Sequence, residues 1–234
     1  MLELQIITTS YCNEDILNMN YQYSLLDKVK YKWINIVNNK NRAELSNPNI
    51  FDINGIVKTA DMDGSTHHGL AVNKALTVLE KSSYLLVLDM DFFILKPIKE
   101  ILSYMEEKQL DFYGATYPEN TSRNLQREFP CGFCMFINCR TINTSLLDFT
   151  PTFHDTYNFK KDIYKDMSYK IYEQYKDISR YEAIKCHSVH RPEEYFIGDV
   201  LFGTHFRLKR HRKDNGRYQN SVKDIKNYIK GKIK

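Results

Sequence analysis

The chain has 234 residues, of which 42% are hydrophobic and 26% charged, and its formal net charge is +4. This is the composition of an ordinary globular protein, and the length suits one sizeable α/β domain better than two. No apolar run approaches the ~20 residues that span a bilayer, and the N-terminus lacks the basic region of a signal peptide. We therefore expect no membrane span and a cytoplasmic location, in host cytoplasm if a virus or phage encodes the protein.

The elements predicted in chain order begin with a strand at 4–8, a helix at 13–26 and a strand at 32–37, which is a βαβ opening typical of a parallel sheet. A polar, glycine-bounded loop at 63–69 then leads into a helix at 70–81. The later predictions are strands at 84–88, 112–116 and 132–138, a helix at 98–108, and an apolar segment at 196–206. The order predicts an α/β fold with a mostly parallel central sheet flanked by helices.

The charge is unevenly distributed along the chain. The segment from His205 to Lys234 holds eleven Lys and Arg residues and only two acidic ones. Such a segment indicates an anionic partner, for example a diphosphate or a nucleic acid, although a solvated tail would look the same. Because few large apolar residues follow Phe206, we expect this part to bury little core. We divide the chain into a domain at 1–206 and a basic tail at 207–234 that is flexible or part of that domain.

Five cysteines are present, at Cys12, Cys131, Cys134, Cys139 and Cys186. Their odd number favours a reducing compartment. The Cys131-x-x-Cys134 pair has no matching second pair, so packed thiols are favoured over a zinc site.

Two carboxylates stand where a buried strand ends. The apolar run Tyr84–Leu88 stops at Asp89, and Asp91 follows after one residue. In open α/β sheets, ligands bind beyond the carboxyl ends of the strands. Buried carboxylates must be paired or must hold a metal, and hard oxygen ligands suit Mg²⁺ or Mn²⁺ carrying a diphosphate. A surface turn in which both carboxylates pair with Lys96 or cap hydroxyl groups is the structural alternative.

The stretch from His68 to Leu76, followed by a hydrophobic strand ending in Asp-x-Asp, resembles the nucleotide-sugar glycosyltransferases of GT-A fold. The resemblance covers the layout from Leu4 to Phe93 and is looser as far as His205. It implies a single GT-A (Rossmann-like) domain, an Mn²⁺ or Mg²⁺ cofactor and a nucleotide-sugar donor of the UDP-sugar type. The acceptor hydroxyl would belong to a glycan, a protein or modified DNA.

The resemblance also implies site residues. Asp91 and Asp89 would bind the metal, and His205 would complete its coordination. Asp89 would also contact the ribose or a metal-bound water. The residues expected to contact the donor, at strand ends, on the glycine-containing helix or in the basic tail, are Thr8, Thr9, Asn39, His68, Asn73, Asp89 and Arg207. His205 and His68 each have a structural alternative as ordinary hydrogen-bonded histidines.

The catalytic base is sought in the run from Pro192 to Asp199. An inverting transferase needs a carboxylate near the acceptor hydroxyl to accept its proton. The run supplies three carboxylates before a glycine turn, and we rank Asp199 first and Glu194 second. A helix cap or a turn is the structural alternative for each.

Two other functions compete with glycosyl transfer. A phosphatase of the haloacid-dehalogenase type also places Asp-x-Asp after a hydrophobic strand, but its motif lies near the N-terminus and is followed by other residues than Phe92-Phe93. A non-catalytic nucleic-acid-binding module would use the basic tail, yet it leaves Asp89 and Asp91 without a role.

Overall fold

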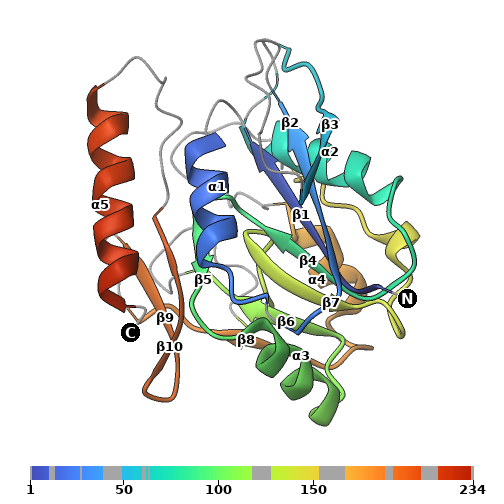
Figure 1. Cartoon of the computed structure of the whole chain (residues 1–234). Helices are drawn as coiled ribbons and strands as arrows, with labels where there is room; N and C mark the ends of the chain where they lie inside the picture. The colour runs from blue at the N-terminus through green and yellow to red at the C-terminus, as the bar shows by residue number, and fades with distance from the viewer. Residues whose placement is uncertain are drawn as a thin grey trace, which may run out of the picture.

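The computed structural model describes residues 2–10, 14–26, 28–38, 49–59, 62, 64–117, 128–152, 167–187, 192–206 and 216–232, with the backbone alone at 2 and at 216–221. Within these ranges the chain forms a three-layer α/β structure, with helices on both faces of a large sheet (Figure 1). No helix among these residues is long and apolar enough to cross a bilayer.

The large sheet has seven strands in the order β3-β2-β1-β4-β7-β6-β8. β7 runs antiparallel to both of its neighbours, and the other pairings are parallel. The prediction of a mostly parallel central sheet is therefore confirmed. The strands are β1 (Leu2–Ser10), β2 (Tyr31–Val37), β3 (Ile50–Asn54), β4 (Ser82–Leu88), β6 (Phe112–Ala115), β7 (Cys134–Asn138) and β8 (Tyr181–Ile184).

A second, three-stranded sheet was not predicted. It is antiparallel and has the order β5-β10-β9, where β5 is Phe92–Ile94, β9 is Glu193–Ile197 and β10 is Val200–His205. The apolar segment expected at 196–206 is therefore a hairpin with β9, turning at Gly198-Asp199. β5 follows the two aspartates directly. Because β10 pairs with β5, the last residue of β10, His205, lies close to the end of β4.

Four of the described helices cover the two faces of the large sheet. On one face α1 (Glu14–Tyr23) and α3 (Ile98–Glu107) share a core with the small sheet, and on the other α2 (Gly64–Leu76) packs with α4 (Tyr169–Tyr175). β4 contributes side chains to both cores because its residues alternate between the two faces of the sheet. Leu86 and Leu88 lie in the core with α1 and α3, and Leu85 and Val87 lie in the core with α2 and α4.

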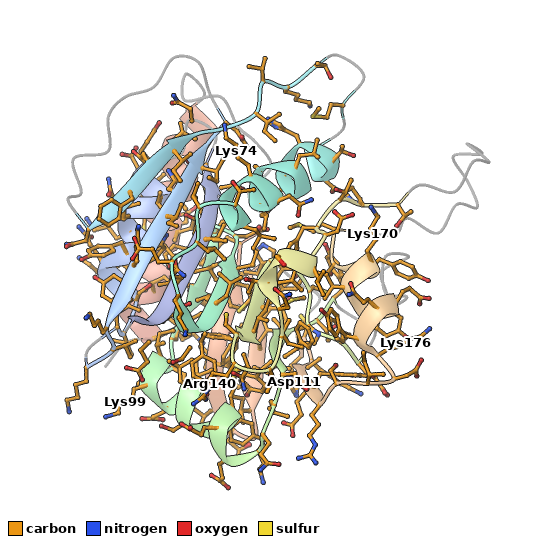
Figure 2. All side chains as sticks on the ribbon, turned by 90° about the vertical axis from the view of Figure 1, so that its right-hand side faces the viewer. Lys74, Lys99, Asp111, Arg140, Lys170 and Lys176 are labelled. Carbon is orange, nitrogen blue, oxygen red and sulfur yellow. The ribbon has the colours of Figure 1, made fainter. Side chains whose placement is uncertain are left out.

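α2 begins earlier than predicted. Residues 64–69, interpreted as a loop from their glycines and polar side chains, form its first turns. Gly69 is needed there because a Cβ would lie 2.1 Å from the carbonyl oxygen of Phe149. A close approach between the helix and this segment, and not a turn, explains the glycine. At the other end of α2, Lys74 donates from Nζ to the carbonyl oxygen of Asn54 at 2.6 Å (Figure 2).

The C-terminal segment contributes to the core, contrary to expectation. α5 (Gly216–Lys232) lies beside α1 (Figure 1). Ile225 and Ile229 are 1% and 0% exposed, in a cluster with Ile16, Met19 and Phe93. The net charge of this segment concealed an apolar stripe, so the prediction that it buries little apolar surface is wrong.

Candidate metal and donor site

The two aspartates lie in a tight turn between β4 and β5. The buried run of β4 ends at Leu88, and the Asp89 amide donates to the carbonyl oxygen of Phe133 at 2.8 Å. The turn closes when the Phe92 amide donates to the Asp89 carbonyl oxygen at 3.0 Å. The backbone therefore reverses at once after the strand, and both carboxylates project from one short turn.

His205 reaches this turn from the last position of β10. β10 pairs with β5 so that His205 lies opposite Phe92 and Gly203 lies opposite Ile94. A Cβ on Gly203 would be 2.8 Å from the Phe93 carbonyl oxygen, so glycine permits this close pairing. The pairing places an imidazole against carboxylates more than 110 residues earlier in the sequence.

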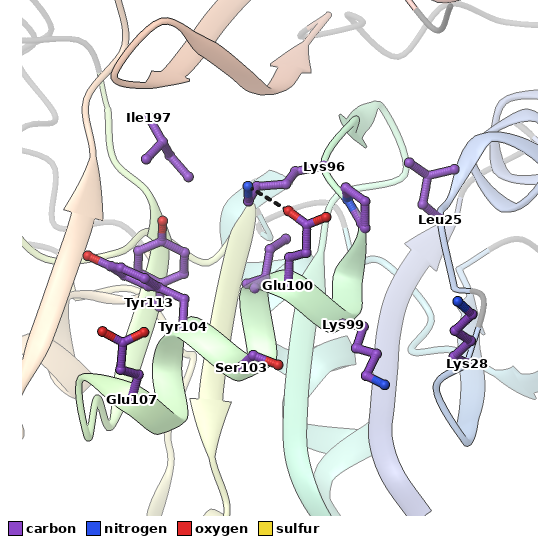
Figure 3. Close-up of a pocket in the computed structure, with 12 residues that line it drawn as sticks. Leu25, Lys28, Lys96, Lys99, Glu100, Ser103, Tyr104, Glu107, Tyr113 and Ile197 are labelled. Atoms are coloured by element: carbon purple, nitrogen blue, oxygen red, sulfur yellow. Dashed lines mark ion pairs between the residues drawn. The ribbon is translucent and has the colours of Figure 1, made fainter.

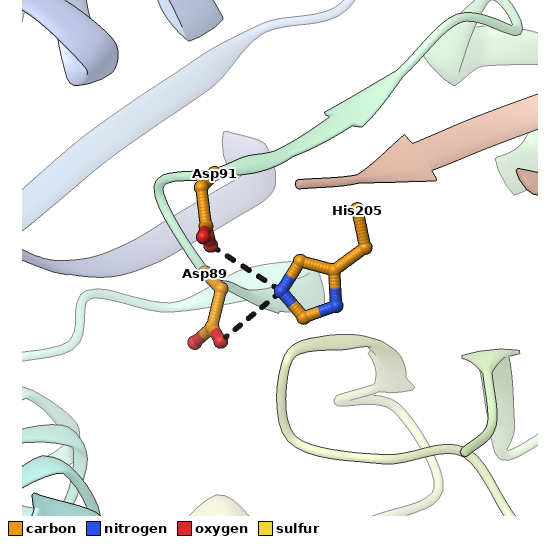
Figure 4. A group of neighbouring side chains, drawn as sticks. All are labelled: Asp89, Asp91 and His205. Carbon is orange, nitrogen blue, oxygen red and sulfur yellow. Dashed lines mark ion pairs between the residues drawn. The ribbon is translucent and has the colours of Figure 1, made fainter. Parts of the chain in front are cut away.

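The three side chains form a compact group (Figure 4). Nε2 of His205 lies 3.3 Å from Oδ1 of Asp91 and 3.8 Å from Oδ2 of Asp89. One ligand atom from each residue lies within 4.8 Å of the others. Two carboxylates and one imidazole therefore point toward a common centre.

Burial differs across the group. The side chains of His205 and Asp91 are 5% and 10% exposed, whereas that of Asp89 is 25% exposed. The imidazole of His205 stacks on Phe133, with ring centroids 4.8 Å apart and planes 27° apart. A ligand would therefore approach the group from the Asp89 side, while Phe133 and the small sheet fix the imidazole from behind.

The donor set fits a divalent cation. Two carboxylates close together in a partly buried site repel each other unless a positive charge lies between them. Carboxylate oxygens with one imidazole nitrogen suit Mn²⁺ and related ions, and the spread of up to 4.8 Å between ligand atoms leaves room for one ion. Among the described residues, Asp89, Asp91 and His205 are thus a group that could hold such a cation.

Comparison with known proteins rests on structure alone. No family model matches the chain, and no curated protein matches its sequence. A TarS fragment from S. aureus, crystallised with UDP-GlcNAc, aligns over 97% of this chain and 65% of its own, with 10% identity and a TM-score of 0.54. The galactosyltransferase LgtC, in complex with donor and acceptor sugar analogues, aligns over 98% and 96%, with 12% identity and a TM-score of 0.49.

A further TarS structure aligns over 51% of this chain at 14% identity, with a TM-score of 0.38. The chain spans 37% of that fragment's length and 65% of the UDP-GlcNAc-bound one. The match with a TM-score above 0.5 covers 97% of this chain and therefore includes both of its sheets. The chain has the GT-A fold.

In this GT-A fold, His68, one of the predicted donor contacts, lies beside the group. It sits on α2, and its Nε2 is 3.4 Å from Oδ1 of Asp89. Oδ2 of the same carboxylate faces His205. Asp89 therefore lies between two imidazoles at the exposed side of the group.

A carboxylate that the sequence ranking passed over supports His205 from behind. Glu193 is buried and lies opposite His205 in the β9–β10 pairing. Its Oε2 lies 3.8 Å from Nδ1 of His205 and accepts a hydrogen bond from the Tyr195 hydroxyl at 3.0 Å. A regular hairpin turning at Gly198-Asp199 would place Glu193 across from Thr204, and a register shift between Leu201 and Gly203 places it across from His205 instead. The sequence alone did not show that shift.

The two predicted catalytic bases lie elsewhere. Asp199 is exposed in the hairpin turn, six residues along the strand from His205, which is roughly 20 Å. Glu194 points to the opposite side of β9 from Glu193, where Tyr228 and Lys232 of α5 donate to it. The Tyr228 hydrogen bond and then the charge of Lys232 lower the pKa of Glu194, against an opposing effect of partial burial. The structure brings neither carboxylate to the group.

Three further predicted donor contacts, Thr8, Thr9 and Asn73, differ in burial and in hydrogen bonding. Thr8 is buried in β1, and its hydroxyl accepts a hydrogen bond from Nε1 of Trp33 at 3.0 Å. Thr9 is half-buried on the opposite face of the strand. Asn73 bridges α2 to the 148–150 segment through Asp148 and Thr150. Asn39 and Arg207 lie outside the described residues.

A separate hollow of about 690 Å³ lies along α3 (Figure 3). Its walls include Leu25, Lys28, Tyr104 and Ile197, and the Lys96–Glu100 ion pair of 2.9 Å crosses it. Ile197 precedes the hairpin turn, so the hollow lies at the end of the hairpin away from His205. It is distinct from the Asp-Asp-His group.

Proposed function

We propose that the protein is a metal-dependent glycosyltransferase that moves a sugar from a nucleotide-sugar donor to an acceptor hydroxyl. The observation that carries the proposal is the Asp89, Asp91 and His205 group at the carboxyl end of β4 in a GT-A fold. Sheets of this kind bind ligands at that end of their strands. The TarS fragment with the same fold was crystallised with UDP-GlcNAc, which favours a UDP-sugar as the donor.

The chemistry of transfer needs what this group offers. The sugar departs from a nucleoside diphosphate that gains negative charge as the bond breaks. A bound Mn²⁺ or Mg²⁺ would supply the compensating positive charge at the diphosphate. Asp91 and His205, the two more buried members, would hold the ion, and Asp89 would contribute a ligand from the open side.

Neighbouring residues support these roles. The charge of Glu193, 3.8 Å from Nδ1 of His205, would favour a proton on Nδ1 and so leave Nε2 to bind the cation. His68, beside Asp89, would contact the donor. Glu194 and Asp199 stay predictions as the catalytic base, and the distances around the group favour neither. The acceptor could be a hydroxyl of a glycan, a protein or modified DNA.

The domain organisation follows the packing. We propose one domain that includes α5, because Ile225 and Ile229 complete a cluster with α1 and β5. The lysines described on α5, at 223, 226, 230 and 232, would then belong to a docked helix and not to a free tail.

A donor screen tests the proposed function. Purified protein is incubated with UDP-, GDP- and CMP-sugars in Mn²⁺, in Mg²⁺ and in EDTA, and release of the nucleotide is measured. We expect release from one UDP-sugar in Mn²⁺ and none in EDTA, with His205→Ala strongly impaired. Cation-independent release, or turnover of p-nitrophenyl phosphate in place of nucleotide sugars, would overturn the proposal.

A further inference from the structure

One buried amide holds the turn that carries the two aspartates. Nδ2 of Asn20, on α1, donates to the carbonyl oxygen of Met90 at 3.0 Å and to that of Phe92 at 2.8 Å. These two carbonyls flank Asp91 on either side. Asn20 is 1% exposed, so both hydrogens of its amide are committed to this turn and water does not compete for them.

Two further backbone groups of the turn are also engaged. The Phe206 amide donates to the Asp91 carbonyl oxygen at 3.1 Å, and the Asp89 amide donates to the Phe133 carbonyl oxygen at 2.8 Å. Three different elements therefore converge on one turn: α1 through Asn20, the end of β10 through Phe206, and the segment before β7 through Phe133. Of these three contacts, the one from Asn20 is made by a side chain, and it binds the carbonyl groups of the residues before and after Asp91.

The position of a carboxylate in a short turn is set by the backbone to which it is attached. A metal site requires its ligand atoms to be held within about half an ångström of the productive geometry, which residues outside the ligand set accomplish. If the Met90 and Phe92 carbonyls lost their donor, the peptide planes around Asp91 could rotate, and its carboxylate would move relative to Nε2 of His205.

We propose that Asn20 is a positioning residue that fixes the Asp89-Met90-Asp91 turn so that Asp91 and His205 meet at one cation. This inference rests on the proposed function for the identity of the ligand. It assigns to α1 a task besides packing. Ser24, one turn further on, donates to the Asn20 carbonyl oxygen at 2.7 Å and so closes the end of the helix that presents the amide.

A purely structural role predicts a different outcome. Any buried amide that bonds backbone carbonyls stabilises the fold, because unpaired buried carbonyls are costly. Gln5 is such an amide at the opposite end of the large sheet. It is 0% exposed, and its Nε2 donates to the Glu80 carbonyl oxygen and, at 3.1 Å, to the Ser82 hydroxyl. Its Oε1 accepts from the Glu80 amide at 3.0 Å.

The test compares Asn20→Leu with the matched control Gln5→Met, each of which removes a buried amide at similar volume. Mn²⁺ binding without nucleotide is measured by calorimetry, stability by denaturant unfolding, and exchange of the Phe92 amide by hydrogen exchange. We expect both variants to lose stability. Only Asn20→Leu should weaken Mn²⁺ binding, by about 10- to 100-fold, and speed exchange at Phe92.

Asn20→Ser, which keeps one hydroxyl donor, serves if the leucine variant does not fold, and it should weaken Mn²⁺ binding less than tenfold. Mn²⁺ affinities of the Asn20 variants within twofold of the wild-type protein would overturn the positioning role while leaving the proposed function intact. A wild-type protein that binds no Mn²⁺ would overturn both.

Discussion

Glu193 and Glu194 are neighbours in sequence, yet they belong to different parts of the molecule. Glu193 is buried beside His205, at 3.8 Å from Nδ1, on the side of β9 that faces the Asp-Asp-His group. Glu194 faces α5, where the Tyr228 hydroxyl and Lys232 donate to it. Side chains of a strand alternate between its two faces, so Glu193 lies at the candidate site while Glu194, the next residue, binds a helix.

The comparison divides the hairpin into a site face and an α5 face. Changes on the site face should alter cation affinity with little loss of stability, and changes on the α5 face should do the reverse. The β9–β10 hairpin serves both purposes, since the strand that ends in His205 is paired with the strand that binds α5.

The largest effect should come from the site itself. Asp91→Asn removes one anionic ligand, which is worth several kcal/mol, so Mn²⁺ affinity should fall by at least about 100-fold. Stability without metal should be unchanged or slightly higher, because two carboxylates no longer repel. Calorimetry and unfolding of this variant are compared with Asp224→Asn, an exposed aspartate on α5. Unchanged Mn²⁺ affinity in Asp91→Asn would remove the metal role.

On the α5 face, Ile229→Ala should cost about 2–5 kcal/mol of unfolding free energy, because it leaves a cavity where the side chain is 0% exposed. Ile178, which is 78% exposed, supplies the control Ile178→Ala with no expected change. Urea unfolding measures both. Mn²⁺ affinity should stay within about threefold of wild type at temperatures where the variant is folded. A large loss of affinity would show that the two faces are coupled.

Glu193→Gln should weaken Mn²⁺ binding by about tenfold, since it removes a negative charge 3.8 Å from Nδ1 of His205 without breaking a hydrogen bond. The glutamine keeps the size of the side chain and can still accept a hydrogen bond from Tyr195. Calorimetry over a pH series gives the affinity, and Glu194→Gln is the matched control one residue away. Equal Mn²⁺ affinities in the two variants would erase the distinction between the faces.

The smallest effect concerns pH and Glu194. Its pKa lies below the ordinary 4.5 because Tyr228 and Lys232 stabilise the carboxylate. The ionised group therefore adds stability above about pH 4.5, and that stability is lost as the pH falls through the lower folded-state pKa. Glu194→Gln should be less stable than wild type by up to about 1 kcal/mol at pH 7. Unfolding curves measured from neutral to acid pH should show the stability of Glu194→Gln approaching that of the wild-type protein as the pH falls. A stability difference that grows in acid would contradict a lowered pKa for Glu194.

Local signals in the sequence predicted the central part of the molecule. The unbroken apolar run before Asp89 indicated a buried strand, and the βαβ opening indicated parallel pairing. These features are specified by neighbouring residues, so sequence patterns reveal them. The connection of His205 with the aspartates came from the resemblance to GT-A glycosyltransferases and not from a local pattern.

What the sequence did not reveal depends on pairings across long separations. Asn20 bonds to carbonyls about 70 residues away, and nothing near it in the chain marks that role. The face to which each of Glu193 and Glu194 points follows only once the hairpin register is known. For α5 a signal existed, since Val222, Ile225 and Ile229 recur at helical spacing, but the surrounding lysines concealed it.

The central claim is that Asp89, Asp91 and His205 hold a divalent cation that binds the diphosphate of a nucleotide sugar. Calorimetric titration of UDP into the wild-type protein, with Mn²⁺ and with EDTA, tests it most directly. We predict one UDP site that is measurable with Mn²⁺ and at least about 100-fold weaker in EDTA, and the same weak binding in Asp91→Asn whether or not Mn²⁺ is present. UDP affinity that is equal with Mn²⁺ and with EDTA would contradict it.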